Sequence, residues 1–267
     1  MIYIKTPKEI EIMKESGRLL ADILYQVSAY TKAGMATIEL NDKAEELVKK
    51  SGCNPSFKNY KGPDGKRPFP AVLCVSINDE VVHGIPSKER ILKSGDVVSI
   101  DLGIRYKNLH TDMAITFAVD AIERLNKKTV DMIEITQRAL MAGIKTIKDG
   151  SFLGDIGFAI QSYVEARGFN VVKKLVGHGI GYSVHEEPDI PNFGKKGKGI
   201  QLKNGMTLAI EPMVTEENAD VFLDKDGWTW KTKDGFLAAH FEHTVVVTKF
   251  GAEILTCLTQ TKFGSII

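Results

Sequence analysis

Signatures of several common enzyme classes are missing from this 267-residue sequence. It contains no Gly-x-x-x-x-Gly-Lys phosphate-binding loop, no Gly-x-Ser-x-Gly nucleophile elbow and no His-Glu-x-x-His zinc motif. No apolar run approaches the length of a membrane span. The formal net charge is only +1, so we expect neither a nucleic-acid nor a membrane partner.

Cysteine is also scarce. Cys53, Cys74 and Cys257 have no metal-type spacing, which is typical of reduced thiols in a cytoplasmic protein. A charged helical pattern starts within the first ten residues, so we expect no signal peptide. The composition, 43% hydrophobic and 26% charged, is ordinary for a globular protein long enough to bury a core without disulfides.

Periodic apolar residues predict four helices. The first begins after Thr6, which with Pro7 and Glu9 has the features of a capping box. We expect the other three helices at residues 37–50, 126–148 and 153–167.

The helical segments repeat within the chain. Gly34 and Gly52 match Gly150 and Gly168 at the same offset, and apolar residues between them match as well. This indicates an internal duplication, although two unrelated helix pairs with a shared spacing are the alternative. We therefore expect a single domain spanning residues 1–267, with related halves of approximately 1–120 and 121–267.

Strand-forming segments follow each helix pair. They lie at residues 71–77, 97–103, 109–119, 207–215, 228–232 and 236–248. Asp226-Gly227 and Asp234-Gly235 are turn signals between the last three. The predicted fold class is α+β, an antiparallel sheet covered by two pairs of helices.

Four carboxylates interrupt these apolar strands: Asp101, Asp112, Glu211 and Glu242. A buried lone carboxylate is costly unless it is paired or binds a metal. A hairpin with Tyr106-Lys107 at its tip would place Asp101 directly opposite Asp112, where two like charges need a cation. Turn capping or structural ion pairs are the alternative for any single carboxylate.

His178 lies between Gly177 and Gly179, which let the backbone approach a site closely. One such histidine is weak evidence for a ligand. Together with the four carboxylates, however, it forms an oxygen-rich set suited to two divalent ions.

These residues belong to motifs that together resemble the type I methionine aminopeptidases over nearly the whole chain. The motifs are His83-Gly84-Ile85-Pro86, Asp101-Leu102-Gly103, Thr111-Asp112, Gly177-His178-Gly179-Ile180-Gly181, His185-Glu186-Glu187-Pro188, Ile210-Glu211-Pro212-Met213 and Phe241-Glu242-His243-Thr244. Each is weak alone, but their order and spacing are specific. The resemblance implies the duplicated pita-bread fold and a methionyl aminopeptidase, a dinuclear metallo-exopeptidase.

The resemblance also implies a ligand set for cobalt, manganese, iron or zinc. Asp101 would bind one ion, and Asp112 and Glu242 would bridge both. His178 and Glu211 would complete the coordination of the second ion. A water between the ions would attack the scissile carbonyl, because metal binding lowers the pKa of water.

Further roles follow from the same resemblance. Glu211 would relay a proton, His185 would stabilise the oxyanion, and His83 would contact the substrate near the scissile amide. His240 should share the strand face of Glu242, at a position where many relatives carry glutamine.

The methionine side chain is expected in an apolar pocket, because sulfur packs well against aromatic rings. The implied pocket residues are Phe57, Tyr60, Phe69, Cys74, Val184 and Trp228. Ordinary core packing is the alternative for each of them. The sequence departs from the family pattern in a longer loop at residues 62–68 and in Val184, where a bulkier residue is common.

We therefore expect removal of the N-terminal methionine from nascent proteins and peptides, with a small second residue preferred. The enzyme would be a cytoplasmic monomer, with the ribosome as a candidate partner. A proline-specific peptidase of the same fold is one alternative, although such relatives usually carry a long N-terminal domain that we do not expect here. A non-catalytic peptide-binding or ribosome-associated homologue is another, although such proteins typically lose the ligands that are present here.

Overall fold

The fold, described here from a computed structural model, covers residues 1–62, 67–120, 123 and 125–257. Its helices are α1 (Pro7–Tyr30), α2 (Thr37–Lys50), α3 (Lys127–Ile144) and α4 (Leu153–Glu165). All four predicted helices are therefore present, although α3 and α4 end earlier than expected. The hydroxyl of Thr146 donates to the carbonyl of Gly143 (2.7 Å) where α3 terminates.

Short strands make up the rest of the regular structure in these residues. They are β1 (Asn54–Pro55), β2 (Cys74–Ile77), β3 (Glu80–Val82), β4 (Val97–Tyr106), β5 (Leu109–Ala118), β6 (Asn170–Val171), β7 (Val176–Gly179), β8 (Glu186–Pro191), β9 (Thr207–Ile210), β10 (Met213–Thr215), β11 (Val221–Leu223), β12 (Trp230–Thr232), β13 (Ala238–His240), β14 (Glu242–Val247) and β15 (Ala252–Ile254).

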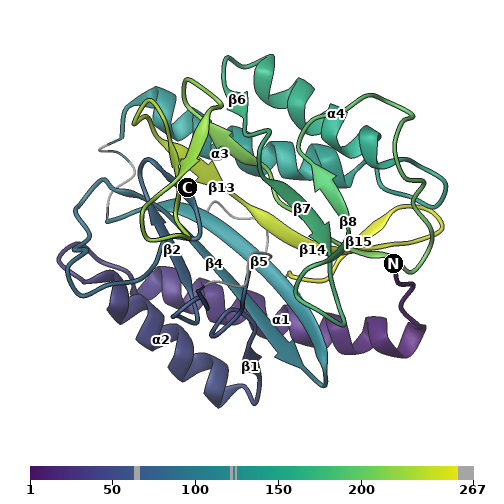
Figure 1. The fold of residues 1–267 in the computed structure, drawn as a ribbon, viewed down its shortest axis with the longest axis horizontal. Coiled ribbons are helices and arrows are strands. Elements are labelled where there is room, and N and C mark those ends of the chain that lie inside the picture. Colours follow the sequence, from purple (N-terminus) through teal and green to yellow (C-terminus); the bar gives the residue numbers. More distant parts are fainter. Residues whose placement is uncertain (63–66, 121–122, 124, 258–267) are drawn as a thin grey trace.

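The largest sheet has the strand order β1-β4-β5-β14-β9-β7-β8, with β2 added to β4 and β15 to β14. Its pairings are antiparallel. The helices α1 and α2 lie along one half of the sheet, and α3 and α4 lie along the other half (Figure 1). This confirms the predicted α+β class, an antiparallel sheet covered by two pairs of helices.

The first helix shows how the sequence sets these layers. The Thr6 hydroxyl accepts from the backbone of Glu9, whose carboxylate accepts from the Thr6 N–H at 2.7 Å. This confirms the predicted capping box. Leu20, Leu24 and Val27 are fully buried on one side of α1, which contacts β4 and β5.

The predicted register of the hairpin formed by β4 and β5 is wrong by two residues. Asp101 pairs with Ala114, and Asp112 pairs with Gly103, so the two aspartates are diagonal neighbours on one face. Lys107 (φ 46°) and Asn108 (φ 68°) form the two-residue turn in place of Tyr106-Lys107. Such a turn requires positive φ at both central residues, which asparagine tolerates.

Two predicted strands are each split in the structure. The 207–215 segment breaks between β9 and β10 because Pro212 has no N–H to continue the ladder. The 236–248 segment breaks at Phe241, between β13 and β14. In both cases the chain passes from one sheet to another, and Glu211 and Glu242 stand at these two crossing points.

No helix in the described part of the chain is long and apolar enough to cross a membrane. The origin of the two halves by duplication stays a prediction.

Candidate metal centre and adjoining pocket

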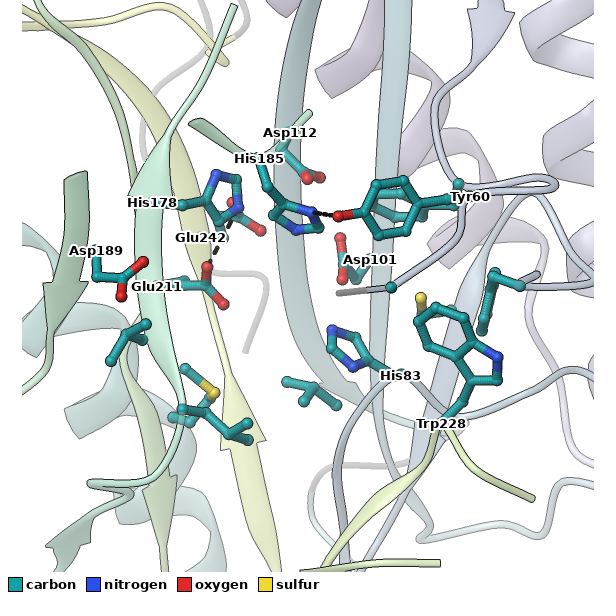
Figure 2. Close-up of a pocket in the computed structure, with 18 of the residues that line it drawn as sticks. Tyr60, His83, Asp101, Asp112, His178, His185, Asp189, Glu211, Trp228 and Glu242 are labelled. Atoms are coloured by element: carbon teal, nitrogen blue, oxygen red, sulfur yellow. Dashed lines mark hydrogen bonds and ion pairs between the residues drawn. The ribbon is translucent and has the colours of Figure 1, made fainter. Parts of the chain in front are cut away.

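A cavity of about 460 Å³ opens beside the middle of the large sheet. All five predicted ligands line it. Asp101 comes from β4, Asp112 from β5 and Glu242 from β14. Glu211 directly follows β9, and His178 lies in β7. Because β4, β5, β14, β9 and β7 are successive neighbours in the sheet, five adjacent strands each contribute one side chain to a common centre (Figure 2).

Three of the four carboxylates of this centre are deeply buried, and Glu211 is slightly more exposed. Asp101 is 8% exposed, and Asp112 and Glu242 are each 2% exposed. Burial raises the pKa of Asp112 to about 7. Burial, followed by repulsion from the neighbouring carboxylates, raises the pKa of Asp101, Glu211 and Glu242 well above their ordinary values.

These side chains fit divalent cations. Asp101 Oδ1 and Glu242 Oε1 are buried without a hydrogen-bond partner among the described residues. One possible ligand atom from each of Asp112, His178 and Glu242 lies within 4.8 Å of the other two. A cation bound here would offset both the mutual repulsion and the missing hydrogen bonds.

His178 is oriented as a neutral ligand. Its Nδ1 lies 2.9 Å from the carbonyl oxygen of Gly179 and donates to it, which leaves Nε2 free to accept or to bind a metal. Burial lowers the pKa of His178 to about 4, so the ring is uncharged near neutral pH. Nε2 lies 3.5 Å from Glu211 Oε1.

The glycines beside His178 allow a close backbone approach. A Cβ at Gly177 would lie 2.4 Å from the oxygen of Ala209, and a Cβ at Gly179 would lie 2.2 Å from the oxygen of Glu187. Any larger residue would push β7 away from its neighbours.

His185 and His83 also line the cavity (Figure 2). The His185 ring contacts the His178 ring, with centroids 4.3 Å apart, and its Nδ1 lies 2.7 Å from the Tyr60 hydroxyl. His83 has a left-handed backbone, φ 61°, and its ring centroid lies 6.3 Å from that of Trp228.

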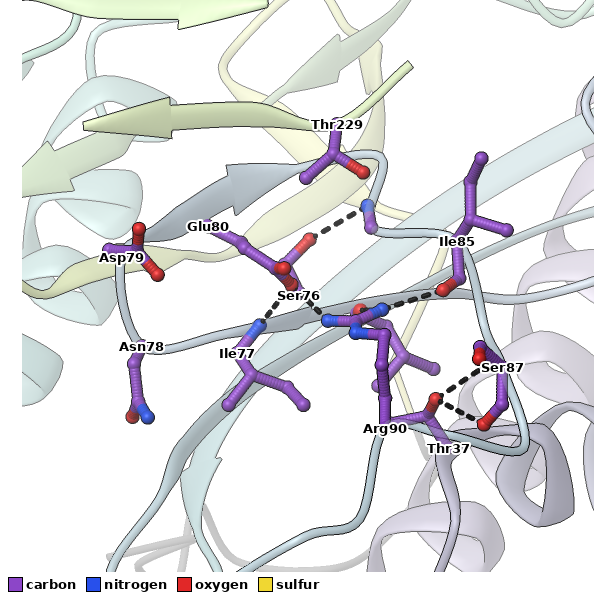
Figure 3. A network of polar contacts seen from close by, with 12 residues as sticks. Thr37, Ser76, Ile77, Asn78, Asp79, Glu80, Ile85, Ser87, Arg90 and Thr229 are labelled. Carbon is purple, nitrogen blue, oxygen red and sulfur yellow. Dashed lines mark hydrogen bonds and ion pairs between the residues drawn. The ribbon is translucent and has the colours of Figure 1, made fainter. Parts of the chain in front are cut away.

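A part-buried polar network holds the loop that carries His83 (Figure 3). Arg90 pairs with Glu80 and donates to the carbonyls of Ile85 (2.6 Å) and Val75 (3.1 Å). The Thr229 hydroxyl lies 3.4 Å from the carbonyl oxygen of His83. Arg90 and Thr229 thus contact this loop from two different segments of the chain.

The six predicted pocket residues lie together. Phe57, Phe69, Cys74 and Val184 form one buried cluster, with Tyr60 and Trp228 packed against it. The ring centroids of Phe69 and Trp228 are 5.3 Å apart. Cys74 pairs with Asp101 across β2 and β4, so the apolar cluster adjoins the carboxylates. Of the long loop at 62–68, residues 63–66 lie outside the described part of the chain.

Several cavity residues were not predicted. Lys174, Glu187 and Asp189 line the wall, and the last two lie on β8, a strand that was missed. Polar and apolar residues alternate over residues 187–190, in step with the burial seen in β8, and this pattern of period two was the available sequence signal. His240 lies on the face of Glu242, as expected, with its Nε2 3.4 Å from Glu211 Oε2.

Comparisons with known proteins agree with this geometry. A family model for metallopeptidase family M24 matches residues 11–249. Methionine aminopeptidase 1 of Bacillus subtilis is 45% identical over 256 residues, which cover 96% of this chain and 99% of that protein. The crystal structure of a methionine aminopeptidase from Thermotoga maritima matches with a TM-score of 0.90 at 44% identity, covering 96% of this chain and 99% of that one.

A more distant match concerns the fold alone. Prolidase from Pyrococcus furiosus matches with a TM-score of 0.76 at 23% identity, covering 96% of this chain and 66% of that one. The architecture is therefore the pita-bread fold that methionine aminopeptidases and prolidases share, and the chain belongs to metallopeptidase family M24.

Proposed function

We propose that this protein removes the N-terminal methionine from nascent proteins and peptides and prefers a small second residue. The observation that carries the proposal is one shared cavity in which a buried set of metal-type ligands adjoins an aromatic pocket. Similarity to methionine aminopeptidases over 96% of the chain supports the same activity.

Asp101, Asp112, His178, Glu211 and Glu242 would hold two divalent ions, with cobalt, manganese, iron and zinc as candidates. When bound, such ions polarise the scissile carbonyl and lower the pKa of water. Their donor set of carboxylates and one imidazole, without thiolate, suits these metals.

The remaining polar side chains would manage protons and developing charge. Glu211 would hold the proton released during attack and pass it to the leaving amine. If the Tyr60 hydroxyl donates to Nδ1 of His185, the proton of that ring is on Nε2, which can donate to the oxyanion. His83 would contact the substrate beside the scissile bond.

The apolar cluster would exclude water and enclose the methionine side chain. Phe57, Phe69 and Trp228 provide aromatic surfaces for its sulfur. The second residue would lie between His83 and His185, which both line the cavity.

A peptide panel tests the proposal. We expect cleavage of Met-Ala-Ser, much slower cleavage of Met-Leu-Ser, and no cleavage of Xaa-Pro peptides, assayed with each candidate ion. Cleavage of Xaa-Pro peptides with Met-Ala-Ser left intact would identify a proline-specific peptidase instead. Peptide binding without turnover under any ion would identify a non-catalytic homologue.

The cellular setting belongs to the same proposal. We expect a cytoplasmic monomer that acts on nascent chains, with the ribosome as a candidate partner. Cys53, Cys74 and Cys257 are all unpaired, in keeping with a reducing compartment. Sedimentation of the purified enzyme, alone and with ribosomes, measures both its oligomeric state and its association.

A further inference from the structure

His240 is a buried histidine at the candidate metal centre to which the proposed chemistry gives no role. It is 1% exposed, and neither Nδ1 nor Nε2 has a hydrogen-bond partner among the described residues. Buried ring nitrogens without partners are costly and uncommon. A histidine placed here only for packing would normally donate one N–H to a carbonyl or hydroxyl, as His178 does.

The strand geometry directs His240 toward the carboxylates. His240 ends β13 and Glu242 begins β14, two positions later, while the intervening Phe241 is buried in the main apolar core. His240 also pairs with Met213 of β10, two residues after Glu211. Two chain crossings between sheets thus bring His240, Glu211 and Glu242 together.

The distances within this group fit shared ligation better than hydrogen bonding. One ligand atom each of Glu211, His240 and Glu242 lies within 4.8 Å of the others. His240 Nε2 is 3.4 Å from Glu211 Oε2, beyond the usual range of about 2.7–3.2 Å for an N–H···O bond. Two donors each about 2.1 Å from one tetrahedral ion stand roughly 3.4 Å apart.

Glu211 also lies between two imidazoles. His178 Nε2 is 3.5 Å from its Oε1, and His240 Nε2 is 3.4 Å from its Oε2. Both rings present Nε2 to the same carboxylate, one to each oxygen.

We propose that His240 is an additional nitrogen ligand of the metal centre, which binds an ion together with Glu211 and Glu242. The inference rests on the proposed metallopeptidase function and adds a residue to its ligand set. A second imidazole makes the centre more favourable for zinc, iron or nickel relative to manganese. The proposal therefore concerns metal preference as well as ligand number.

X-ray absorption at the zinc edge tests this assignment without relying on activity. In chelated protein reloaded with two zinc ions, His178 and His240 together would give an average of one imidazole per zinc. His240→Gln should give half that number. His243→Gln is the matched control, because His243 is half-buried in β14, next to Glu242 and therefore on the opposite face of the strand, where its Nδ1 lies 2.9 Å from the Thr256 hydroxyl. This variant should keep the wild-type number.

Competition titrations provide a second measurement. Because His240 is proposed as a direct ligand, we expect His240→Gln to lose more zinc affinity than the roughly 10–100-fold that loss of a residue supporting a ligand costs, and to lose much less manganese affinity. Circular dichroism of the chelated variants checks their folding. If His240→Gln does not fold, the imidazole number of the wild-type protein is decisive by itself.

The outcomes separate this inference from the proposed function. Half an imidazole per zinc in the wild-type protein, or an unchanged number in His240→Gln, overturns the role of His240. In that case loss of zinc in Asp112→Asn would still support the metal centre. Failure of the wild-type protein to bind any divalent ion would overturn both.

Discussion

Replacing Gly177 with alanine tests the claim that close strand packing positions His178. The added Cβ would lie 2.4 Å from the Ala209 oxygen and 3.3 Å from Glu211 Cγ, whereas ordinary contact begins at 3.4 Å. The distance to the Ala209 oxygen is therefore about 1 Å too short for an ordinary contact. Since His178 pairs with Ala209, β7 has to move away from β9 by roughly this distance.

A displacement of ~1 Å at a catalytic group can reduce the rate by about 100-fold. We therefore expect Gly177→Ala to lower kcat for Met-Ala-Ser by that order and to reduce the stoichiometry of bound metal. Overpacking should also reduce the free energy of unfolding by ~1–3 kcal/mol. Steady-state kinetics, metal analysis and urea unfolding measure these three effects.

The matched control is Gly251→Ala. A Cβ at Gly251 meets no atom within 4 Å, so the same substitution should leave kinetics and stability unchanged. If Gly177→Ala retains wild-type kcat and metal content, close packing of β7 against β9 does not position His178, and the reasoning fails.

Three further predictions concern the metal, the pH and the ion pair beneath the site. Asp112→Asn should lose metal affinity and most activity, because one of the converging carboxylates loses its charge; full activity with two bound ions would contradict the assigned role. Burial lowers the pKa of His83 from 6.5 to about 4, so its contribution to stability is complete above pH 6.5 and is lost as the pH falls towards 4. His83→Asn should therefore reduce the loss of unfolding free energy between neutral pH and pH 5 by at most ~2 kcal/mol. If urea unfolding shows the same dependence of this free energy on pH in the variant and the wild-type protein, the prediction is refuted. Lys5 Nζ lies 2.5 Å from Glu186 Oε2 with both side chains almost fully buried, so Lys5→Met should cost ~3 kcal/mol; Lys5→Met combined with Glu186→Gln should recover part of it, and equal losses in the single and double variants would show that the buried charge is not the cause.

Local signals in the sequence were sufficient to predict that the four helices are present, although α3 and α4 end earlier than predicted. The Thr6 capping box and the apolar spacing of α1 and α2 depend on contacts within a few residues, and the predicted start of α1 and the predicted bounds of α2 are confirmed. The predicted register of the hairpin was wrong because the register depends on which two residues adopt positive φ. The sequence around 106–108 offered more than one choice of turn, and the structure selects Lys107 and Asn108.

The residues of the apolar pocket and of the cavity wall also differ in how far the sequence could predict them. Phe57, Phe69 and Cys74 were named from a family resemblance, since nothing in their own spacing distinguishes a substrate pocket from ordinary core. The strand β8, with Glu187 and Asp189 on the cavity wall, was missed because its short alternating pattern lies among charged residues.

The sequence by itself determined which chemistry is present, because carboxylates inside apolar strands are too costly to bury without a compensating partner. It named Asp101, Asp112, Glu211 and Glu242 on that ground. Only the tertiary structure decided that five adjacent strands bring these side chains and His178 to one centre. Strand order and the crossings at Pro212 and Phe241 are long-range properties, because the paired residues lie far apart in the sequence: Glu242 and Ala114 are 128 positions apart, and His243 and Ile210 are 33 positions apart. The approach of His240 to Glu211 arises in the same way, from two sheets that meet at these crossings.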